Sequence, residues 1–203
     1  MKIIGVFGQQ RGDEGKGRVV DMLAEECDIV ARFNGGSNAG HTVVLPDGRE
    51  LALHIVPSGI AHDNAVNVIG NGTIVDPIRF AEEVADIERL GIAVTPQKLM
   101  VSSSAHLVLP HYKQLEEIRE LGRGAQGSTK AGIADTYAAK AQRAGVRVER
   151  LLGSHDSLLQ VVRDGLESVQ MARKEHGLPS VDIENEVKLY AAALQKLQPF
   201  VAD

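Results

Sequence analysis

Apolar residues occur in short blocks along most of the chain, and these blocks have the length of strands. The pattern predicts strands at Ile3–Phe7, Asp28–Phe33, Val66–Ile69, Leu99–Val101 and Leu107–Leu109. The first is a continuous apolar run that ends at Gly8, which is typical of a buried parallel strand. Val43–Leu45 and Leu51–Ile55 flank Asp47-Gly48, and this arrangement predicts a hairpin.

Helical spacing appears between these runs and dominates the C-terminal part of the chain. Asp76-Pro77 opens one helix and Gly91 closes it. The pattern predicts further helices at Val19–Ala24, Tyr112–Leu121, Thr136–Arg143, Ser154–Lys174 and Ser180–Ala202. We therefore predict an α/β fold: a P-loop-like, mostly parallel sheet with flanking helices over residues 1–150, and a C-terminal helical subdomain over residues 151–203.

Charge and cysteine content narrow the class of protein. The chain has 22 basic and 27 acidic residues, a net charge of −5, which disfavours binding to nucleic acid through bulk charge. Cys27 is the only cysteine, so an internal disulfide is impossible and a reducing compartment fits. No apolar stretch has the length of a membrane span. We expect a cytoplasmic protein with neither nucleic acid nor membrane as a partner.

A glycine-rich loop follows the first predicted strand and carries the sequence Gly8-Gln-Gln-Arg-Gly-Asp-Glu-Gly-Lys-Gly-Arg18. Glycines let backbone N–H groups approach phosphate oxygens, and Lys16 adds a positive charge at the start of a helix. The loop is two residues longer than a standard P-loop, and Gly17 occupies the position of the Mg²⁺-binding hydroxyl. Either no metal binds or Asp13 replaces that ligand. A plain glycine-rich connection is the alternative, whereas the missing G-x-G-x-x-G spacing disfavours a dinucleotide loop.

A second glycine-rich loop, Asn34-Gly-Gly-Ser-Asn-Ala-Gly-His-Thr42, follows the second predicted strand. In a parallel sheet both loops emerge at the same edge, where open α/β folds bind ligands. His41 is then placed to donate a proton to a reacting oxygen, and the Gly40 carbonyl to reach a metal. A lone loop histidine is more often simply solvated, but with Asp13 it forms an acid–base pair.

These two loops together resemble the paired signature of adenylosuccinate synthetases, in Gly12-Asp-Glu-Gly-Lys-Gly17 and Gly35-Gly-Ser-Asn-Ala-Gly-His-Thr42. The resemblance continues through Leu53–Gly59, Ile69–Gly72, Gly127–Thr129, Gly132-Ile133, Tyr137, Lys140, Arg143 and Val146–Val148. It covers about residues 1–150, whereas the later helices resemble the family only in pattern. The family couples IMP to L-aspartate with GTP and Mg²⁺, in the pathway to AMP.

The resemblance implies a role for individual residues. It makes Asp13 the general base that takes the proton from N1 of IMP, and His41 the acid that assists γ-phosphoryl transfer from GTP to the purine 6-oxygen. It places the GTP phosphates against Gly12, Glu14, Gly15, Lys16, Gly17, Arg18, Gly40 and Thr42. It places IMP against Asn38, Ala39, Ser128, Thr129 and Arg143, and Mg²⁺ against Asp13 and Gly40. Arg143 would reach IMP across a subunit interface, which implies a homodimer.

Three departures from the family leave alternatives open. Arg11 replaces the usual tryptophan, and Thr129-Lys-Ala-Gly-Ile-Ala-Asp135 lacks the arginine of the family's Thr-Gly-Arg-Gly-Ile-Gly-Pro stretch. Family members are also much longer, and no segment here resembles their guanine-reading, aspartate-binding or second IMP-binding segments. The chain is therefore expected to be incomplete for catalysis alone. The alternatives are a non-catalytic nucleotide-binding or dimerisation module, a related phage-type purine-nucleotide–aspartate ligase, and a generic P-loop NTPase.

Overall fold

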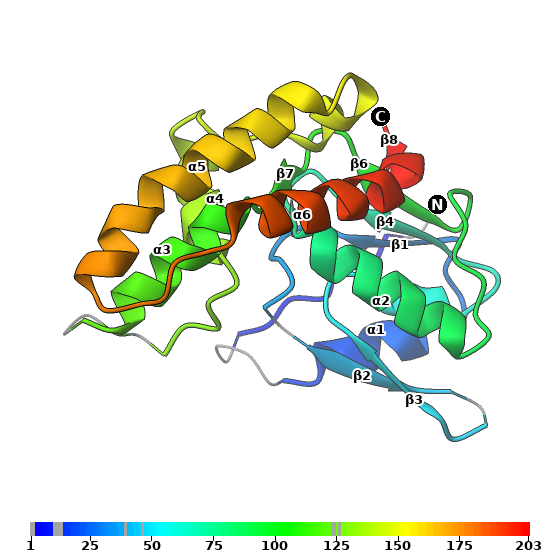
Figure 1. Ribbon diagram of the computed structural model, residues 1–203. Coiled ribbons are helices and arrows are strands. Elements are labelled where there is room, and N and C mark those ends of the chain that lie inside the picture. Colours follow the sequence, from blue (N-terminus) through cyan, green and yellow to red (C-terminus); the bar gives the residue numbers. More distant parts are fainter. Residues whose placement is uncertain (1–2, 10–13, 39, 46, 123–124, 126) are drawn as a thin grey trace.

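The computed structural model of the chain describes residues 3–9, 14–38, 40–45, 47–122, 125 and 127–203 (Figure 1). Its main sheet has four parallel strands in the order β1-β4-β6-β8. These strands are β1 (Ile29–Arg32), β4 (Val66–Ile69), β6 (Leu99–Ser102) and β8 (Val201–Ala202). Neighbouring strands pair in register, with Ile29 opposite Val66 and Asn67 opposite Leu99. The predicted mostly parallel α/β sheet is confirmed.

Two smaller sheets flank the main one. The strands β2 (His41–Val44) and β3 (Glu50–Leu53) form the predicted hairpin, in which Gly48 has a φ of 85°. Such a positive φ is the reason for glycine in this turn. The strands β5 (Ile74–Val75) and β7 (His106–Leu107) form a short parallel pair.

Helices cover the sheets, and local signals fix several of their ends. They are α1 (Lys16–Ala24), α2 (Pro77–Arg89), α3 (Pro110–Glu120), α4 (Ile133–Ala141), α5 (Asp156–Glu175) and α6 (Ile183–Leu197). Short 3-10 helices are η1 (Ser58–Ala61), η2 (Val148–Leu152) and η3 (Gln198–Phe200). The Asp76 side chain accepts the Ile78 N–H at 3.2 Å, which caps α2 as predicted from Asp76-Pro77. Within the described residues, no helix is both long enough and apolar enough to cross a bilayer.

One hydrophobic core joins the sheets to the C-terminal helices. α6 lies along α2 and α5 lies along α3 (Figure 1). The buried side chains of α5 and α6, such as Leu166 and Tyr190, belong to the same cluster as Leu99 and Val101 of β6. The hydroxyl of Tyr190, which is 1% exposed, donates to the Val108 carbonyl at 3.1 Å. Residues 151–203 are thus mainly helical, and their apolar side chains share the core of residues 1–150.

The predicted first strand, Ile3–Phe7, is wrong. Residues 3–9 contain no strand, and the side chains of Ile3 and Phe7 are 84% and 72% exposed. A strand requires a hydrogen-bonding neighbour, and β1 pairs on one side only, with β4. The apolar run at residues 3–7 is therefore present in the sequence, but among the described residues it forms no hydrogen-bonded pair with another strand. The Phe7 ring instead contacts Phe33, with 5.6 Å between ring centroids.

The predicted end of the last helix is also wrong. The helix over Ser180–Ala202 ends at Leu197, because Pro199 lacks the N–H that an α-helix requires and lies in η3. Val201 and Ala202 then pair with Val101 and Ser102 and add β8 to the main sheet. The chain thus returns to the sheet after the helical segment.

Candidate active site

The start of α1 lies in the first glycine-rich loop. Gly15, with a φ of 71°, is the residue before the helix, and among the described residues no side chain caps its first turn. The first backbone N–H groups of a helix carry partial positive charge and need an acceptor. A phosphate group meets that need without further distortion. Gly15, Lys16 and Gly17, which the resemblance assigns to the GTP phosphates, lie at this helix start, and their assignment stays a prediction.

Lys16 and Glu14 lie over Gly8. The Lys16 ammonium group forms an ion pair with the Glu14 carboxylate. A Cβ at Gly8 would be 2.4 Å from the Lys16 Nζ atom and 2.7 Å from both Glu14 oxygens, so glycine leaves the room for this pair. Glu14 thus competes with an incoming phosphate for the charge of Lys16. Arg18 lies two residues beyond Lys16 on α1 and is exposed.

His41 packs directly on Gly17. A Cβ at Gly17 would be 2.6 Å from the Cβ, Cγ and Cδ2 atoms of His41, closer than real side chains approach. The serine or threonine of a standard P-loop therefore has no space here. The glycine that looked like a lost metal ligand is the position at which the second loop contacts the first. The two glycine loops meet at Gly17 and His41, although the first loop does not follow a strand, as the shared sheet edge would require.

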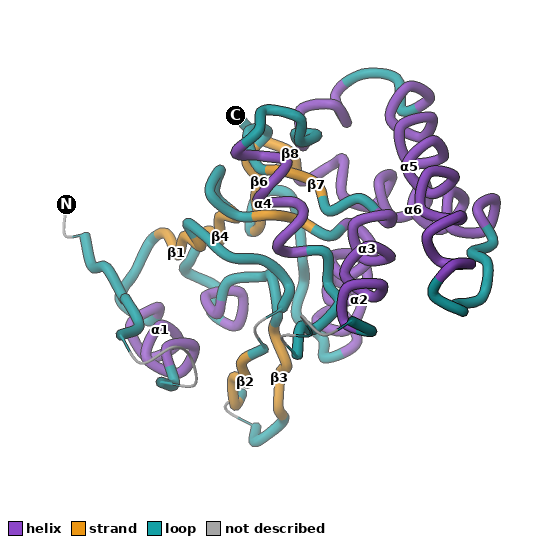
Figure 2. The backbone as a smooth tube through the Cα atoms, turned by 90° about the vertical axis from the view of Figure 1, so that its left-hand side faces the viewer, coloured by secondary structure: helices purple, strands orange, loops and turns teal. Residues whose placement is uncertain are grey.

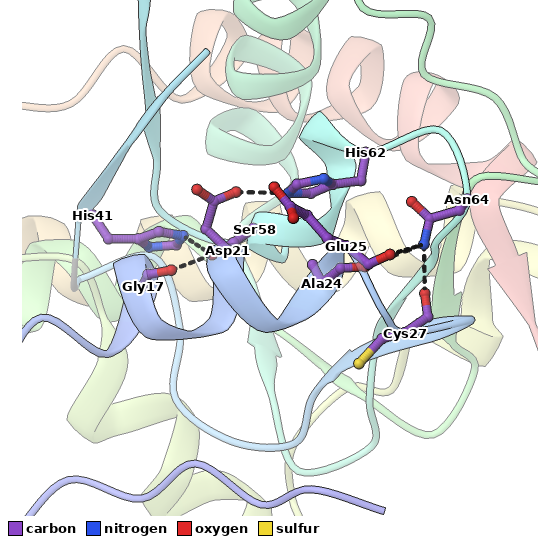
Figure 3. A network of polar contacts seen from close by, with 9 residues as sticks. All are labelled: Gly17, Asp21, Ala24, Glu25, Cys27, His41, Ser58, His62 and Asn64. Atoms are coloured by element: carbon purple, nitrogen blue, oxygen red, sulfur yellow. Dashed lines mark hydrogen bonds and ion pairs between the residues drawn. The ribbon is translucent and has the colours of Figure 1, made fainter. Parts of the chain in front are cut away.

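The segment from Ser58 to Asn64 fastens α1 along its length (Figure 3). The Ser58 Oγ atom lies 3.0 Å from His41 Nε2 and donates to the Gly17 carbonyl at 3.2 Å. Further along, His62 Nε2 contacts the Asp21 carboxylate at 2.8 Å. Asn64 donates to the carbonyls at the end of the helix, including that of Cys27 at 3.0 Å. The position of α1 is thus set from outside the glycine loops.

The environment of His41 keeps its ring uncharged at neutral pH. Burial, the nearby Arg32 guanidinium and His54 lower the pKa of His41 to about 4. Burial disfavours the charged form, and a neighbouring cation disfavours it further. A bound polyphosphate would oppose the effect of the neighbouring cation and raise the pKa of His41, because an anion favours the imidazolium form. His41 is therefore suited to gain a proton when an anionic ligand arrives.

Arg32 and Tyr137 hold the second glycine loop from two sides. Arg32, the last residue of β1, donates to the Gly36 carbonyl at 2.5 Å and also to the His54 carbonyl. The Tyr137 hydroxyl, from α4, accepts the Gly35 N–H at 2.8 Å and lies 3.0 Å from the Gly72 carbonyl, to which it donates. These contacts position the loop that leads to His41.

The buried Glu83 of α2 supports the turn between β3 and η1. Its carboxylate accepts the backbone N–H groups of His54, Ile55 and Val56 at 2.9, 3.0 and 3.0 Å. Burial raises the pKa of Glu83, although the three N–H groups oppose that shift. This turn leads directly into Ser58, so the helical layer contributes to the placement of the site.

Three supporting residues escaped the sequence analysis as site residues. Arg32 ends an apolar run, Glu83 lies on the apolar face of a predicted amphipathic helix, and Ser58 lies within a segment noted only for its family resemblance. A charged residue at an otherwise apolar position is the signal that could have identified the first two. Nothing comparable marks Ser58 as a contact of His41.

The structure brings only part of the predicted site together. Gly12, Asp13 and Ala39 lie outside the described residues, so the convergence of Asp13 and His41 stays a prediction. Asn38, Gly40 and Thr42 are exposed around His41, and the Gly40 backbone faces the His54 ring.

The residues predicted to bind IMP on the α4 side do not reach His41. Ser128 and Thr129 are exposed before α4, and Arg143 is exposed after it, with a φ of 61°. Among the described residues, no hydrogen bond or ion pair joins these three to His41 or Lys16. Their assignment to IMP stays a prediction.

A metal site formed by the protein alone is not visible in the described part of the chain. No group of three or more His, Cys, Asp or Glu side chains there is arranged to hold a metal ion. Mg²⁺ in phosphoryl-transfer sites is usually bound by one or two carboxylates together with phosphates and water. The Glu14 carboxylate and the Gly40 carbonyl, which lie in the two glycine-rich loops, are oxygen groups of the kind that Mg²⁺ prefers.

Comparison with known proteins identifies the family. The family described as adenylosuccinate synthetase matches residues 5–203. Adenylosuccinate synthetases of Clostridium perfringens and Clostridium acetobutylicum are 42% and 43% identical over 200 and 202 residues. Each alignment covers 98% of this chain but 46% of the relative. The chain thus spans about half the length of the curated relatives it matches.

Solved structures agree with this assignment. The fully ligated adenylosuccinate synthetase of Plasmodium falciparum matches with a TM-score of 0.74 and 30% identity, over 95% of this chain and 44% of that one. A cyanophage S-2L succinoaminodeoxyadenylate synthetase, bound to dGMP and dATP, matches with a TM-score of 0.52 and 28% identity, over 65% of this chain and 36% of that one. With its glycine loops meeting at His41 and Gly17, the chain belongs to the adenylosuccinate synthetase family.

Proposed function

We propose that this chain supplies the GTP-binding and phosphoryl-transfer part of an adenylosuccinate synthetase. The reaction is the GTP-dependent ligation of IMP and L-aspartate, with Asp13 and His41 as its acid–base pair. The observation that carries the proposal is the contact of the His41 ring with Gly17 at the start of α1, where the residue before the helix is Gly15. A purely nucleotide-binding module has no need of a titratable ring at this point.

The chemistry assigns each group a task. Asp13 removes the proton from N1 of IMP, and the 6-oxygen attacks the γ-phosphorus of GTP as GDP leaves. The nearby phosphates favour the protonated, positively charged form of His41. In that form His41 stabilises the negative charge that develops during this transfer. The amine of aspartate then adds at C6 and the phosphate departs. Lys16, released from Glu14, binds the β- and γ-phosphates.

We include Mg²⁺ in the proposal as a cofactor held by Asp13 and the Gly40 carbonyl together with the GTP phosphates. When bound, it neutralises charge on the transferring phosphoryl group. The exposed Ser128, Thr129 and Arg143 are assigned to IMP, with Arg143 reaching the site of a second subunit in a homodimer. We place the protein in the cytoplasm, with neither nucleic acid nor membrane as a partner.

The exposed apolar surface around α1 supports a need for additional polypeptide. Ile3, Phe7, Met22 and Ile29 are 84%, 72%, 68% and 62% exposed. Among the described strands, β1 pairs only with β4 and lies at the end of the main sheet (Figure 2). Exposed apolar area of this kind marks an interaction surface. The relatives carry about as much sequence again outside the matched part, and we propose that this remaining half covers the surface and completes the active site.

The test combines this chain with the part of the Clostridium perfringens enzyme that lies outside its match to residues 1–203. Adenylosuccinate formation from IMP, aspartate and GTP is measured with the wild-type chain, with His41→Gln, and with the exposed α6 substitution Lys188→Gln as a matched control. Product is expected with the wild-type and Lys188→Gln chains, and a decrease of at least about 100-fold with His41→Gln.

Two results would contradict the proposal. GTP binding without any product, even when a stable complex of the two halves is isolated, supports a non-catalytic nucleotide-binding or dimerisation module. Product formed only when dGMP replaces IMP supports the phage-type ligase.

A further inference from the structure

Ser58 is the residue through which a separate part of the chain touches both glycine loops. It is the first residue of η1 and is 3% exposed. Its Oγ atom contacts His41 Nε2 at 3.0 Å and the Gly17 carbonyl oxygen at 3.2 Å (Figure 3). Neither loop contains Ser58, and the proposed reaction assigns it no task.

The single proton of the Ser58 hydroxyl determines the direction of this hydrogen-bond chain. A carbonyl oxygen can only accept, so Ser58 donates its proton to Gly17. Its oxygen is then the acceptor for His41, and His41 Nε2 must carry a proton. This conclusion holds whether the ring is neutral or charged, because Nε2 is protonated in the imidazolium as well.

We infer that Ser58 is a positioning residue for His41: its hydroxyl holds the ring against the first turn of α1 and selects the tautomer protonated at Nε2. This inference deepens the proposed function, because it states how the proposed acid is held before the ligand arrives. The Nδ1 atom is then the ring nitrogen that the Ser58–Gly17 chain leaves unused. A histidine fixed in one tautomer and one orientation needs no reorganisation before reaction.

A purely structural role for Ser58 makes a different prediction, and the chain provides a matched control for it. Asn64 lies on the same segment and donates to carbonyls at the far end of α1, including those of Ala24 at 3.2 Å and Cys27 at 3.0 Å. Asn64→Ala therefore loosens the attachment of α1 without touching His41. If Ser58 acts only by holding the segment in place, Ser58→Ala and Asn64→Ala should have similar effects on the His41 ring.

The test is ¹⁵N NMR of the histidine rings in the unliganded chain at neutral pH, with His41→Gln used to assign the His41 signals. The two ring nitrogens have different ¹⁵N shifts according to which one is protonated. We expect the Nε2–H form in the wild type and in Asn64→Ala, and a shift to a mixture of both tautomers in Ser58→Ala. An Nδ1–H ring in the wild type would overturn the inference without any variant, and so would equal effects of Ser58→Ala and Asn64→Ala.

This measurement requires neither substrate nor the second half of the enzyme, so the two proposals can fail separately. An unchanged tautomer in Ser58→Ala overturns the positioning role and leaves the proposed ligase intact. Loss of the Nε2–H form in Ser58→Ala, with no product from any complemented mixture, supports the positioning role and contradicts the ligase. In a complemented active enzyme, Ser58→Ala should lower kcat about tenfold and change the KM for GTP less than about twofold.

Discussion

Two regions of the molecule are packed very differently. One is the segment around α1, which comprises α1 and the residues beside it, such as Phe7 and Val30. The other is the helical layer formed by α2, α3, α5 and α6. The helical layer shares a large core with the sheet, in which residues such as Leu166 and Leu194 are fully buried. The segment around α1 buries little more than Ala24, Val30 and Ala65 in a small separate cluster. Its apolar residues Phe7 and Met22 are 72% and 68% exposed.

This difference indicates that the residues of the large core and the residues of the proposed active site lie in different regions of the chain. Lys16, Gly17 and His41, which carry the proposed reaction, lie on the weakly packed side. Ser58 contacts both Gly17 and His41, whereas Arg32 holds the second loop at the Gly36 carbonyl and Glu83 accepts the N–H groups of the turn before Ser58. A site with few apolar contacts can rearrange when a ligand or a partner polypeptide arrives.

The largest expected effect tests the packing difference directly. Leu166→Ala removes a fully buried side chain from α5, and it should lower the free energy of unfolding by about 2–5 kcal/mol. Met22→Ala on α1 should change it by no more than about 0.5 kcal/mol, because that side chain is already in solvent. Urea denaturation measures both. Similar decreases in the free energy of unfolding for the two variants would show that the α1 face is covered in solution. The two regions would then not differ in packing.

A smaller effect is expected where the two regions are joined. Glu83→Gln replaces one of the two oxygens that accept the N–H groups of His54, Ile55 and Val56 with an NH₂ group that cannot accept. The free energy of unfolding should fall by about 1–3 kcal/mol, because the new NH₂ group would face the buried Ile55 N–H, donor against donor, and that N–H would keep only its longer 3.2 Å contact with the remaining oxygen. Glu82→Gln, at an exposed neighbouring position, is the control and should change it little. If both variants behave alike in urea denaturation, Glu83 does not support the turn.

Local signals in the sequence located the helical layer well. Asp76-Pro77 and Gly91 predicted a helix that the structure places at Pro77–Arg89, because a cap and a stop signal act within one turn. The apolar run Ile3–Phe7 failed as a strand for the opposite reason. Whether such a run pairs depends on a neighbouring strand, and its own residues carry no information on that neighbour.

The site was predictable by residue type but not by contact. Gly17 and His41 were both selected from the two loops, yet their packing against each other depends on how α1 meets β2. The contact also explains why glycine stands where a standard P-loop has a hydroxyl. Ser58 and Glu83 make contacts with groups far away in the sequence, as Arg32 does at the His54 carbonyl, and a pattern of side-chain types cannot indicate such partners.

The Gly17–His41 contact gives a third prediction, on ligand binding instead of stability. Gly17→Ala places a methyl group at the position now occupied by the His41 ring, so the ring must move. GTP affinity should fall about tenfold in calorimetry, while the helix itself gains up to about 1 kcal/mol from the better helix former. Val19→Ala, an exposed position on the same helix, is the control. Unchanged affinity in Gly17→Ala would show that this contact is absent when GTP is bound.

The smallest expected effect concerns pH and lies in the helical layer. The His111 ring packs against Gly165 of α5, and its buried Nδ1 atom has no hydrogen-bond partner among the described residues. Burial lowers the pKa of His111 below its ordinary value of 6.5. The unfolded chain therefore binds this proton more readily than the folded one as the pH falls below 6.5, and stability decreases in that direction.

Urea denaturation at about pH 7.5 and about pH 5.5 should show that the wild type loses about 1 kcal/mol more than His111→Gln between the two conditions. The comparison uses the change with pH, so any difference between the two proteins at the higher pH cancels. His106, whose pKa burial also lowers, is present in both proteins and cancels as well. Parallel pH profiles would mean that the ring is hydrated in solution, and that the packing of α3 on α5 is looser than the contrast with the α1 segment implies.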